Sequence, residues 1–205
     1  MIIEFSVYDT PDYSVEHLLD SSNNLKMIQN FEVGNQAGGL EDYLKYQSEN
    51  DERNNNSRTY LVKDVVTGEL VCYFSLRTGL ITIQISGDSF DSFPAIELAN
   101  LAVNKKYKDA HPDATELGFY AFRKFILPIS RCMAKYVGVN SLYIYALPEE
   151  KLIQHYQKMG FSRLPESQEK FVQHHVKPNM MKAAFLCIRY YKSLLGRLPQ
   201  TLRCR

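Results

Sequence analysis

The order of apolar and polar positions divides the chain into β-rich runs and three helical runs. Strands are expected where β-branched and aromatic residues gather in short runs, and helices where apolar residues recur with the period of a helix. The predicted strands cover residues 2–8, 59–64, 69–83, 95–103, 141–147 and 161–164. Thr67–Gly68 separates the second run from the third, so these two are predicted to form a hairpin. The run 95–103 is largely apolar, which is typical of a central strand.

The predicted helices lie near residues 40–46, 115–137 and 149–159. Ahead of the longest, Asp113 and Glu116 have the spacing of a capping box. Pro128 lies inside it and has no N–H to donate, so it should kink or split the helix. The last helix carries Tyr156 on its apolar face and ends before Gly160, a residue typical of a helix C-terminus.

The remaining segments are rich in turn-forming and polar residues. Residues 21–39 are a mixed segment of turn formers, and 48–58 and 85–94 are predicted as loops. Residues 182–191 form a last apolar run, which is either a strand or the start of a terminal helix. The order of elements predicts a mixed α/β fold with at least one crossover. We expect one domain over residues 1–205, with 165–205 as a C-terminal strand and extension.

Composition narrows the class of protein. A hydrophobic content of 45% allows a full core and argues against wholesale disorder. The four cysteines are far apart and include no C-x-x-C, so neither a zinc site nor a disulfide framework is indicated, and a reducing cytoplasm is expected. No run of 18 apolar residues is present, and the acidic N-terminus lacks the basic region of a secretory signal. No metal ligand and no membrane partner are predicted.

The net charge of +1 hides an asymmetry between the two halves of the chain. Residues 1–100 hold 6 basic and 16 acidic side chains, a net charge of −10, whereas residues 101–205 hold 18 and 7, a net charge of +11. Two interpretations stay open. The halves pair across a surface of one domain, or the basic half attracts a polyanion such as a cofactor's phosphates or RNA.

The sequence resembles the GNAT N-acetyltransferases over roughly residues 28–165. The resemblance rests on LAVNKKY at 101–107, SLYIYAL at 141–147 and EEKLIQHYQKMGF at 149–161, in which a tyrosine precedes a Gly-Phe pair by four residues. FEVGNQAGGLEDYL, SRTYLVKD and ELVCYFSL are similar to one branch of that family, the toxins of toxin–antitoxin pairs that acetylate aminoacyl-tRNA. The resemblance implies a GNAT fold, a mixed central sheet flanked by helices, with acetyl-CoA as co-substrate.

The resemblance also implies roles for particular residues. The backbone of Leu101, Ala102 and Val103 would pair with pantetheine and polarise the thioester. The alternative is an ordinary buried strand, and both hold at once because the role is played by the backbone only. Tyr156 matches the general acid toward the departing sulfur; the alternative is a core tyrosine. Glu97 lies where some members carry a general base; the alternative is a strand-end carboxylate in solvent or in a salt bridge. The toxin-like branch generally lacks this base and lets water take the proton.

The pyrophosphate loop departs from the family's pattern of Arg or Gln, two residues, Gly, one residue, and Gly or Ala. Lys108 fits the first position and Gly118 the last, but about five extra residues intervene and the first glycine is absent. Leu117 and Gly118 would offer N–H groups to the phosphates. The inserted acids, Asp113 and Glu116 among them, would compete for the same place. The loop is therefore either altered but able to bind CoA, or degenerate.

Other polar residues are weaker site predictions. Asn100 and Arg77 could face the substrate. His155 adjoins Tyr156 but points about 100° away on a helix. His174 and His175 lie in a polar segment, where a solvated role is expected rather than a ligand role.

Two functions of different classes follow. The first is an enzyme that transfers acetyl from acetyl-CoA to a primary amine by direct attack in a ternary complex. The sequence does not identify the acceptor, which could be the α-amine of an aminoacyl-tRNA. It also does not decide whether the enzyme is a homodimer. The second is a non-catalytic GNAT-like module that binds a protein or RNA through the same fold. Nucleic-acid binding as the primary function is supported by no recognised motif.

Overall fold

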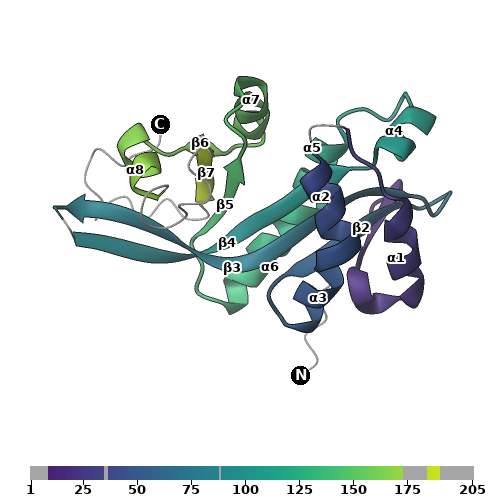
Figure 1. Cartoon of the computed structure of the whole chain (residues 1–205), viewed down its shortest axis with the longest axis horizontal. Coiled ribbons are helices and arrows are strands. Elements are labelled where there is room, and N and C mark those ends of the chain that lie inside the picture. The colour runs from purple at the N-terminus through teal and green to yellow at the C-terminus, as the bar shows by residue number, and fades with distance from the viewer. Residues whose placement is uncertain (1–8, 35–36, 88, 173–183, 190–205) are drawn as a thin grey trace. The chain divides into compact units, whose positions relative to one another are not determined.

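The computed structural model describes residues 9–34, 37–87, 89–172 and 184–189 of the chain. Seven strands of this described part form a mixed sheet in the order β1-β2-β3-β4-β5-β7-β6, with flanking helices (Figure 1). The predicted mixed α/β fold is confirmed. The chain divides into two compact units, Met1–Arg77 with Leu98–Cys132 and Thr78–Glu97 with Met133–Arg205. The single-domain assignment stays a prediction. In the described ranges, no helix is long and apolar enough to cross a membrane.

The strands of the first unit are antiparallel. β1 (Tyr13–His17) pairs with β2 (Arg58–Asp64), which pairs with the first half of β3 (Leu70–Ser86). The turn between β2 and β3 contains Gly68 with a φ of 73°, so the predicted hairpin is confirmed. β1 was not predicted because it is short and half polar, and its pairing depends on β2. The strand predicted at 2–8 lies outside the described residues.

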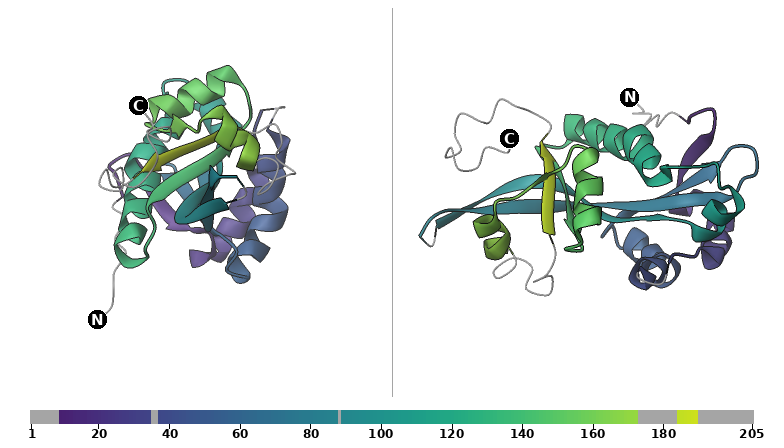
Figure 2. Two further views of the ribbon diagram at one scale, coloured as in Figure 1. Left: turned by 90° about the vertical axis from the view of Figure 1, so that its left-hand side faces the viewer. Right: turned by 90° about the horizontal axis from the view of Figure 1, so that it is seen from above.

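Six short helical segments cover one face of this unit (Figure 2). They are η1 (Leu18–Asp20), α1 (Ser22–Met27), η2 (Ile28–Asn30), α2 (Gly38–Asp42), the π-helical η3 (Tyr43–Gln47) and α3 (Ser48–Arg53). Their apolar residues meet those of the strands in a cluster of Leu18, Ile28, Phe31, Leu44, Leu61, Leu70, Tyr73 and Ala102. This cluster is the core of the first unit.

The loop predicted at 48–58 is wrong in its first half, where α3 forms. The Ser48 hydroxyl donates to the Leu44 carbonyl at 2.6 Å, which continues the preceding helical segment. Arg53 pairs with Glu49 one turn earlier at 2.7 Å. Glu52 is buried and accepts a hydrogen bond from the Thr59 backbone. The helix could not be predicted from the polar composition of this segment, because one of its acidic residues, Glu52, faces the core.

The other face of the first unit carries the helix that begins at Leu117 (Figure 2). This run comprises α5 (Leu117–Ala121), the π-helical η4 (Phe122–Ile126) and α6 (Leu127–Tyr136). The Leu127 amide donates to the Phe122 carbonyl, five residues back, just ahead of Pro128. The helix is not split at Pro128, because it passes through this widened turn and continues as α6, and a kink there stays a prediction.

In the second unit, β3 and β4 (Ser89–Val103) continue as a hairpin around Gly87, whose φ is 52°. The loop predicted at 85–94 is therefore wrong. Ile81 and Ile83 are buried on one face of this hairpin, and the hydroxyls of Thr82 and Ser92 lie 2.9 Å apart across its strands. The polar residues predicted as a loop are the second strand of the hairpin, and its apolar contacts come from elsewhere in the unit.

The second unit completes its sheet with three further strands. β5 (Ser141–Ala146) is parallel to β4 and antiparallel to β7 (Ala184–Arg189), which also pairs with β6 (Ser162–Arg163). Of the two alternatives for residues 182–191, the strand is right. α7 (Glu150–Lys158) forms as predicted and ends near Gly160, whose φ is 100°.

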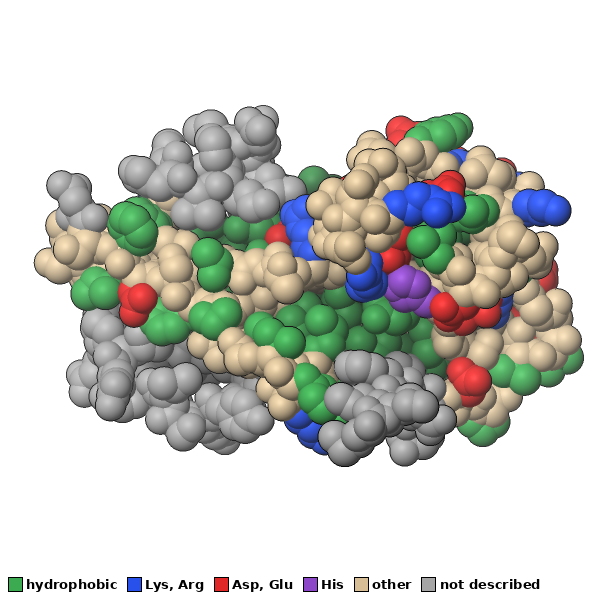
Figure 3. All heavy atoms as spheres, turned by 90° about the horizontal axis from the view of Figure 1, so that it is seen from below, with side chains coloured by type: hydrophobic (Ala, Val, Ile, Leu, Met, Phe, Trp, Pro, Cys, Tyr) green, Lys and Arg blue, Asp and Glu red, His purple; other side chains and the backbone are tan. Residues whose placement is uncertain are grey.

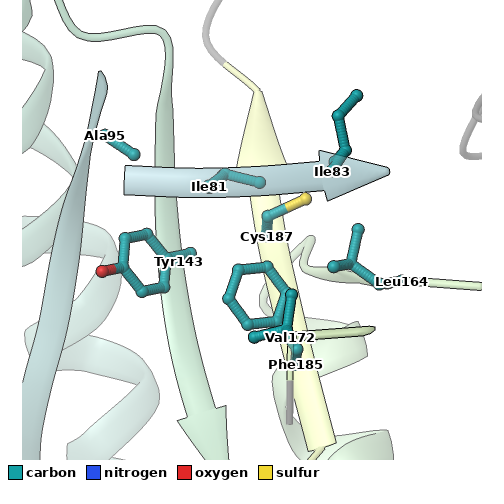
Figure 4. Close-up of a cluster of buried hydrophobic side chains, with 8 residues drawn as sticks. All are labelled: Ile81, Ile83, Ala95, Tyr143, Leu164, Val172, Phe185 and Cys187. Atoms are coloured by element: carbon teal, nitrogen blue, oxygen red, sulfur yellow. The ribbon is translucent and has the colours of Figure 1, made fainter. Parts of the chain in front are cut away.

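The hairpin crosses the β5–β7 strands and buries a second core (Figure 4). This cluster consists of Ile81, Ile83, Ala95, Tyr143, Leu164, Val172, Phe185 and Cys187. α8 (Glu166–Phe171), which was not predicted, packs beside it. The side-chain amide of Gln168 accepts from the Gln84 N–H at 3.0 Å and donates to its carbonyl at 3.1 Å. α8 thus pairs with the edge of the hairpin as a strand would.

Candidate functional site

β4 carries the residues predicted to contact pantetheine at its carboxyl end, in the first unit. Leu101 and Val103 are half-buried, and Ala102 is buried. A strand end of this kind presents backbone N–H and C=O groups in a fixed direction, as the predicted backbone role requires. These three residues are the last of β4, and their role in binding pantetheine stays a prediction.

Asn104, which directly follows β4, fixes the chain beyond the strand. Its side chain donates to the Leu70 carbonyl at 2.8 Å and accepts from the Lys106 and Glu32 amides at 3.2 and 3.3 Å. It therefore joins β3, β4 and the segment after η2. Sequence analysis missed this residue, although an asparagine between a strand and a helix is a typical N-cap signal.

The segment that leads into the altered pyrophosphate loop forms a helix, α4 (Lys105–Ala110), and the non-helical residues 111–116 connect it to Leu117. The Tyr107 hydroxyl donates to Asp64 at 2.6 Å, and His111 lies 2.9 Å from Glu69. The rings of Tyr107 and His111 stack at 4.2 Å. Lys108 is exposed in the last turn of α4. α4 and His111, which follows it, thus pack on the β2–β3 turn.

The contacts of α4 lower the pKa values of two carboxyl groups. The hydrogen bond from Tyr107 lowers the pKa of Asp64, and the hydrogen bond with His111 lowers the pKa of Glu69. Burial, aided by the same bond to Asp64, raises the pKa of Tyr107. The shifts of Asp64 and Tyr107 favour the forms that their contact needs, a carboxylate accepting from a protonated phenol, and the shift of Glu69 favours the carboxylate beside His111.

The long helix begins without an acidic cap. Glu116 precedes Leu117 with a φ of 53°, and its side chain makes no capping hydrogen bond. The Tyr120 amide donates to the Glu116 carbonyl at 2.9 Å, so the amides before it belong to the unsatisfied first turn. The predicted capping box of Asp113 and Glu116 is wrong, because the left-handed residue turns the chain at the place where a cap would stand.

The position of Glu116 matches that of the missing glycine. In the family's pattern the first glycine stands two residues before the last, and Gly118 fits the last. A positive φ is the conformation that glycine adopts without steric cost. Gly118 itself lies against β4, since a Cβ added to it would meet Val103 Cγ2 at 3.7 Å. The loop therefore keeps a glycine-like backbone with a glutamate side chain.

Tyr156 belongs to the second unit, on α7. It is 8% exposed and meets the edge of Phe161, with ring centroids 5.7 Å apart. Burial raises its pKa to about 12, so the phenol keeps its proton at neutral pH. A buried, protonated phenol can act as a hydrogen-bond donor or a general acid. His155 is exposed beside it.

Glu97 is also in the second unit and is 4% exposed. The Tyr143 hydroxyl donates to its Oε2 atom at 2.8 Å. The solvated alternative is therefore wrong, because the carboxylate is enclosed. Arg77 and Asn100, the two weaker predictions, are half-buried on β3 and β4. His174 and His175 lie outside the described residues.

The charge asymmetry is in part internal pairing. Lys106 lies 2.8 Å from Glu32, and His111 pairs with Glu69, so basic residues of the second half meet acids of the first. Over α1–α3, acidic and basic side chains are interspersed, at the upper right of Figure 3. The pairs of Lys106 and His111 favour the first of the two interpretations for the surface around α4. In the described ranges, no group of three His, Cys, Asp or Glu side chains could hold a metal ion.

Comparison with known proteins finds relatives by structure and none by sequence. No family model matches the chain, and no curated protein does. A variant of the toxin AtaT with one tyrosine replaced by phenylalanine has a TM-score of 0.59 at 20% identity, covering 88% of this chain and 91% of that one. A similar variant of KacT has a TM-score of 0.60 at 18% identity, covering 87% and 95%.

A third neighbour is AtaT complexed with acetyl-methionyl-tRNAfMet. It has a TM-score of 0.57 at 20% identity and covers 85% of this chain and 94% of that one. AtaT has also been solved with its antitoxin AtaR and acetyl-CoA. At these identities the likeness establishes the fold. The chain therefore has the GNAT fold of these acetyltransferase toxins, as the resemblance to their branch predicts.

Proposed function

We propose that the protein is an N-acetyltransferase that moves acetyl from acetyl-CoA to a primary amine. The observation that carries this proposal is the start of the long helix, where neither Glu116 nor Asp113 caps the first amides. Those amides and the helix dipole favour binding of an anion. We expect this anion to be the pyrophosphate of CoA, given the fold.

The residues present fit the cofactor in the first unit. The amides of Leu117 and Gly118 would donate to the pyrophosphate, and the exposed Lys108 would add positive charge. The backbone of residues 101–103 would pair with the amides of pantetheine. The strand end and the helix start are neighbours here, since a Cβ added to Gly118 would lie 3.7 Å from Val103 Cγ2.

The chemistry needs one acid and one proton acceptor. The neutral amine attacks the thioester carbonyl, a C–N bond forms and the C–S bond breaks. Tyr156 gives its proton to the departing sulfur, since its raised pKa of about 12 keeps it protonated until the thiolate forms. Glu97 or water takes the proton that the amine must lose.

The acceptor we propose is the α-amine of an aminoacyl-tRNA. AtaT, one of the structural neighbours, forms a complex with acetyl-methionyl-tRNAfMet. The net charge of +11 over residues 101–205 would favour a polyanionic acceptor. A reducing cytoplasm suits the buried thiol of Cys72, which is free.

A binding module without catalysis is the second candidate. Its support is the charge around the altered loop, because Lys105 is paired with Asp109 and Lys106 with Glu32. These pairs leave Lys108 as the exposed lysine of α4 for which no ion pair is described. A loop with so little available positive charge would hold a diphosphate weakly.

Titration of the protein with acetyl-CoA tests the first half of the proposal. Ligand at a hundred times its dissociation constant adds about 2.7 kcal/mol to the free energy of unfolding, which a thermal shift or calorimetry detects. No shift at millimolar acetyl-CoA would favour the binding module.

The second half is tested by CoA release with aminoacyl-tRNA as acceptor. Tyr156→Phe should lower kcat by a factor of about 100 or more while acetyl-CoA still binds. In a binding module the same variant would change neither CoA release nor partner binding.

A further inference from the structure

A buried hydrogen bond joins β4 and β5 at the last residues of their register. The parallel pairing consists of Ile96↔Leu142 and Glu97↔Tyr143. At the second pair, the Tyr143 hydroxyl donates to Glu97 Oε2 at 2.8 Å. Tyr143 is 2% exposed and Glu97 is 4% exposed. At this last pair, a hydrogen bond between the two side chains therefore adds to the pairing of the two strands.

The Tyr143 ring is held in one orientation by its neighbours. It stacks on Phe185 with a centroid distance of 5.2 Å and an interplanar angle of 20°. Tyr145 meets its edge at 5.7 Å. Figure 4 shows the ring inside the second core, with its hydroxyl directed toward the strand that carries Ala95. A rigid aromatic ring fixes its hydroxyl, and therefore fixes the direction from which it can donate.

β3 passes so close to this hydroxyl that only glycine fits. A Cβ added to Gly79 would lie 2.0 Å from the Tyr143 oxygen and 2.9 Å from Cζ. The φ of Gly79 lies outside the left-handed region, so the backbone there does not require glycine. The missing side chain makes room for the phenol instead. Three strands therefore contribute one residue each to this arrangement: Gly79, Glu97 and Tyr143.

We propose that Tyr143 is a positioning residue that holds Glu97 as the proton acceptor for the amine, with Gly79 giving the hydroxyl its place. This inference rests on the proposed acetyltransferase function and decides between Glu97 and water as the base. A carboxylate has two oxygens with about four lone-pair sites, so acceptance of the Tyr143 hydrogen bond does not by itself prevent it from taking a proton. The ammonium form of the acceptor gives its proton to Glu97, Tyr143 keeps its own proton throughout, and the freed amine attacks the thioester.

A role in folding alone would leave the chemistry unchanged. A buried carboxylate requires donors, so Tyr143 would stabilise the protein even if Glu97 never touched a substrate. The two roles separate in the kinetics. A purely structural pair affects the unfolding midpoint, whereas a positioned base affects kcat at saturating substrate.

The test compares CoA release by the wild type, Tyr143→Phe, Glu97→Gln and the double variant, with a mixture of aminoacyl-tRNAs as acceptor. Glu97→Gln should lower kcat by about 100-fold or more, the usual contribution of a general base. Tyr143→Phe should lower kcat by about tenfold with the KM for acetyl-CoA changed less than about twofold. The double variant should be no slower than Glu97→Gln, because the phenol acts through the carboxylate.

Tyr73→Phe is the matched control. Tyr73 is another buried tyrosine, and its hydroxyl donates to the Leu40 carbonyl at 2.5 Å in the first unit. Its loss should lower stability without lowering kcat. If Tyr143→Phe behaves like this control, with a lower midpoint and an unchanged kcat, the pair is structural and the inference is wrong.

The same experiments distinguish a failure of this inference from a failure of the proposed function. A wild type that binds no acetyl-CoA and releases no CoA would overturn the function itself. An active wild type with an unimpaired Glu97→Gln variant would keep the function, assign the proton to water and overturn only the inference. If Tyr143→Phe fails to fold, Glu97→Gln decides, since glutamine keeps an acceptor for the phenol.

Discussion

Glu116 lies two residues before Gly118 and has a left-handed backbone with a φ of 53°. Such a conformation is uncommon for a residue with a Cβ and costs roughly 1 kcal/mol or more. Glycine is the residue that adopts it freely, and the family's phosphate loop has a glycine at this spacing. The loop is therefore altered in side chain and length, while the backbone at its last turn keeps the form that a glycine would give.

Replacement of Glu116 by glycine should improve both stability and cofactor binding. Relief of the left-handed strain should raise the free energy of unfolding by about 1 kcal/mol. Removal of a negative charge next to the phosphate site should strengthen acetyl-CoA binding about tenfold. Denaturant unfolding and calorimetry measure the two effects.

The Glu116→Ala variant serves as the control, because it removes the charge and keeps the strain. It should gain affinity without gaining stability. An unchanged affinity in both variants would mean that the Glu116 carboxylate lies away from the bound phosphates.

The raised pKa of Tyr156 predicts a loss of stability at high pH. The ordinary value is 10.0 and burial raises the folded value to about 12, so the unfolded chain releases this proton first. The stabilising effect is complete below about pH 10 and is lost as the pH rises toward 12. The wild type should lose up to about 3 kcal/mol more than Tyr156→Phe over this window. Urea unfolding at the two ends of the range measures it, and equal losses in both proteins would contradict a burial-raised pKa.

The bond between Tyr107 and Asp64 predicts the opposite dependence at low pH. Tyr107→Phe should lower the free energy of unfolding by about 1 kcal/mol at neutral pH. The folded pKa of Asp64 is lowered chiefly by this bond, so the contribution is present above the ordinary carboxyl value and is lost as the pH falls through the folded value. The difference between wild type and variant should therefore shrink below about pH 4. A difference that stays constant on acidification would show that Tyr107 acts through packing alone.

Gly79→Ala should be strongly destabilising. Its Cβ would lie 2.0 Å from the Tyr143 hydroxyl, so the ring or β3 must move, at a cost of about 2 kcal/mol or more. Gly39→Ala is the control, since nothing lies within 4 Å of its added Cβ and alanine favours the helix by about 1 kcal/mol. Combination with Tyr143→Phe should recover part of the loss at Gly79. Thermal unfolding of the four proteins measures this, and a Gly79→Ala variant as stable as wild type would contradict the close contact.

Local patterns were sufficient for the elements with a strong period. The helix at 149–159 repeats apolar residues on one face, and its C-terminal glycine has the expected positive φ of 100°. The strand at 141–147 is almost wholly apolar and forms β5. Tyr156 could be singled out by the resemblance, because the motif that it forms with Gly160 and Phe161 is local in the sequence.

Segments without such a period were misread. α4 is six residues long and mostly charged, and it is held by contacts to the β2–β3 turn. The second strand of the long hairpin has polar residues at Ser89, Asp91 and Ser92, and only its pairing with β3 makes it a strand. α3 places Glu52 in the core, where His17 and Arg58 lie 3.1 Å from its carboxylate. No propensity scale predicts a buried acid whose partners come from other elements.

The amino-acid sequence by itself determined the alternation of strands and helices, the central strand at 95–103 and the place of Tyr156, because these follow from contacts between near neighbours. The tertiary structure alone decided the environment of Glu97 and the form of the phosphate loop. Tyr143 and Glu97 are 46 residues apart, and Tyr107 and Asp64 are 43 apart. Hydrogen bonds over such separations exist only after the chain has folded, and no local pattern encodes them.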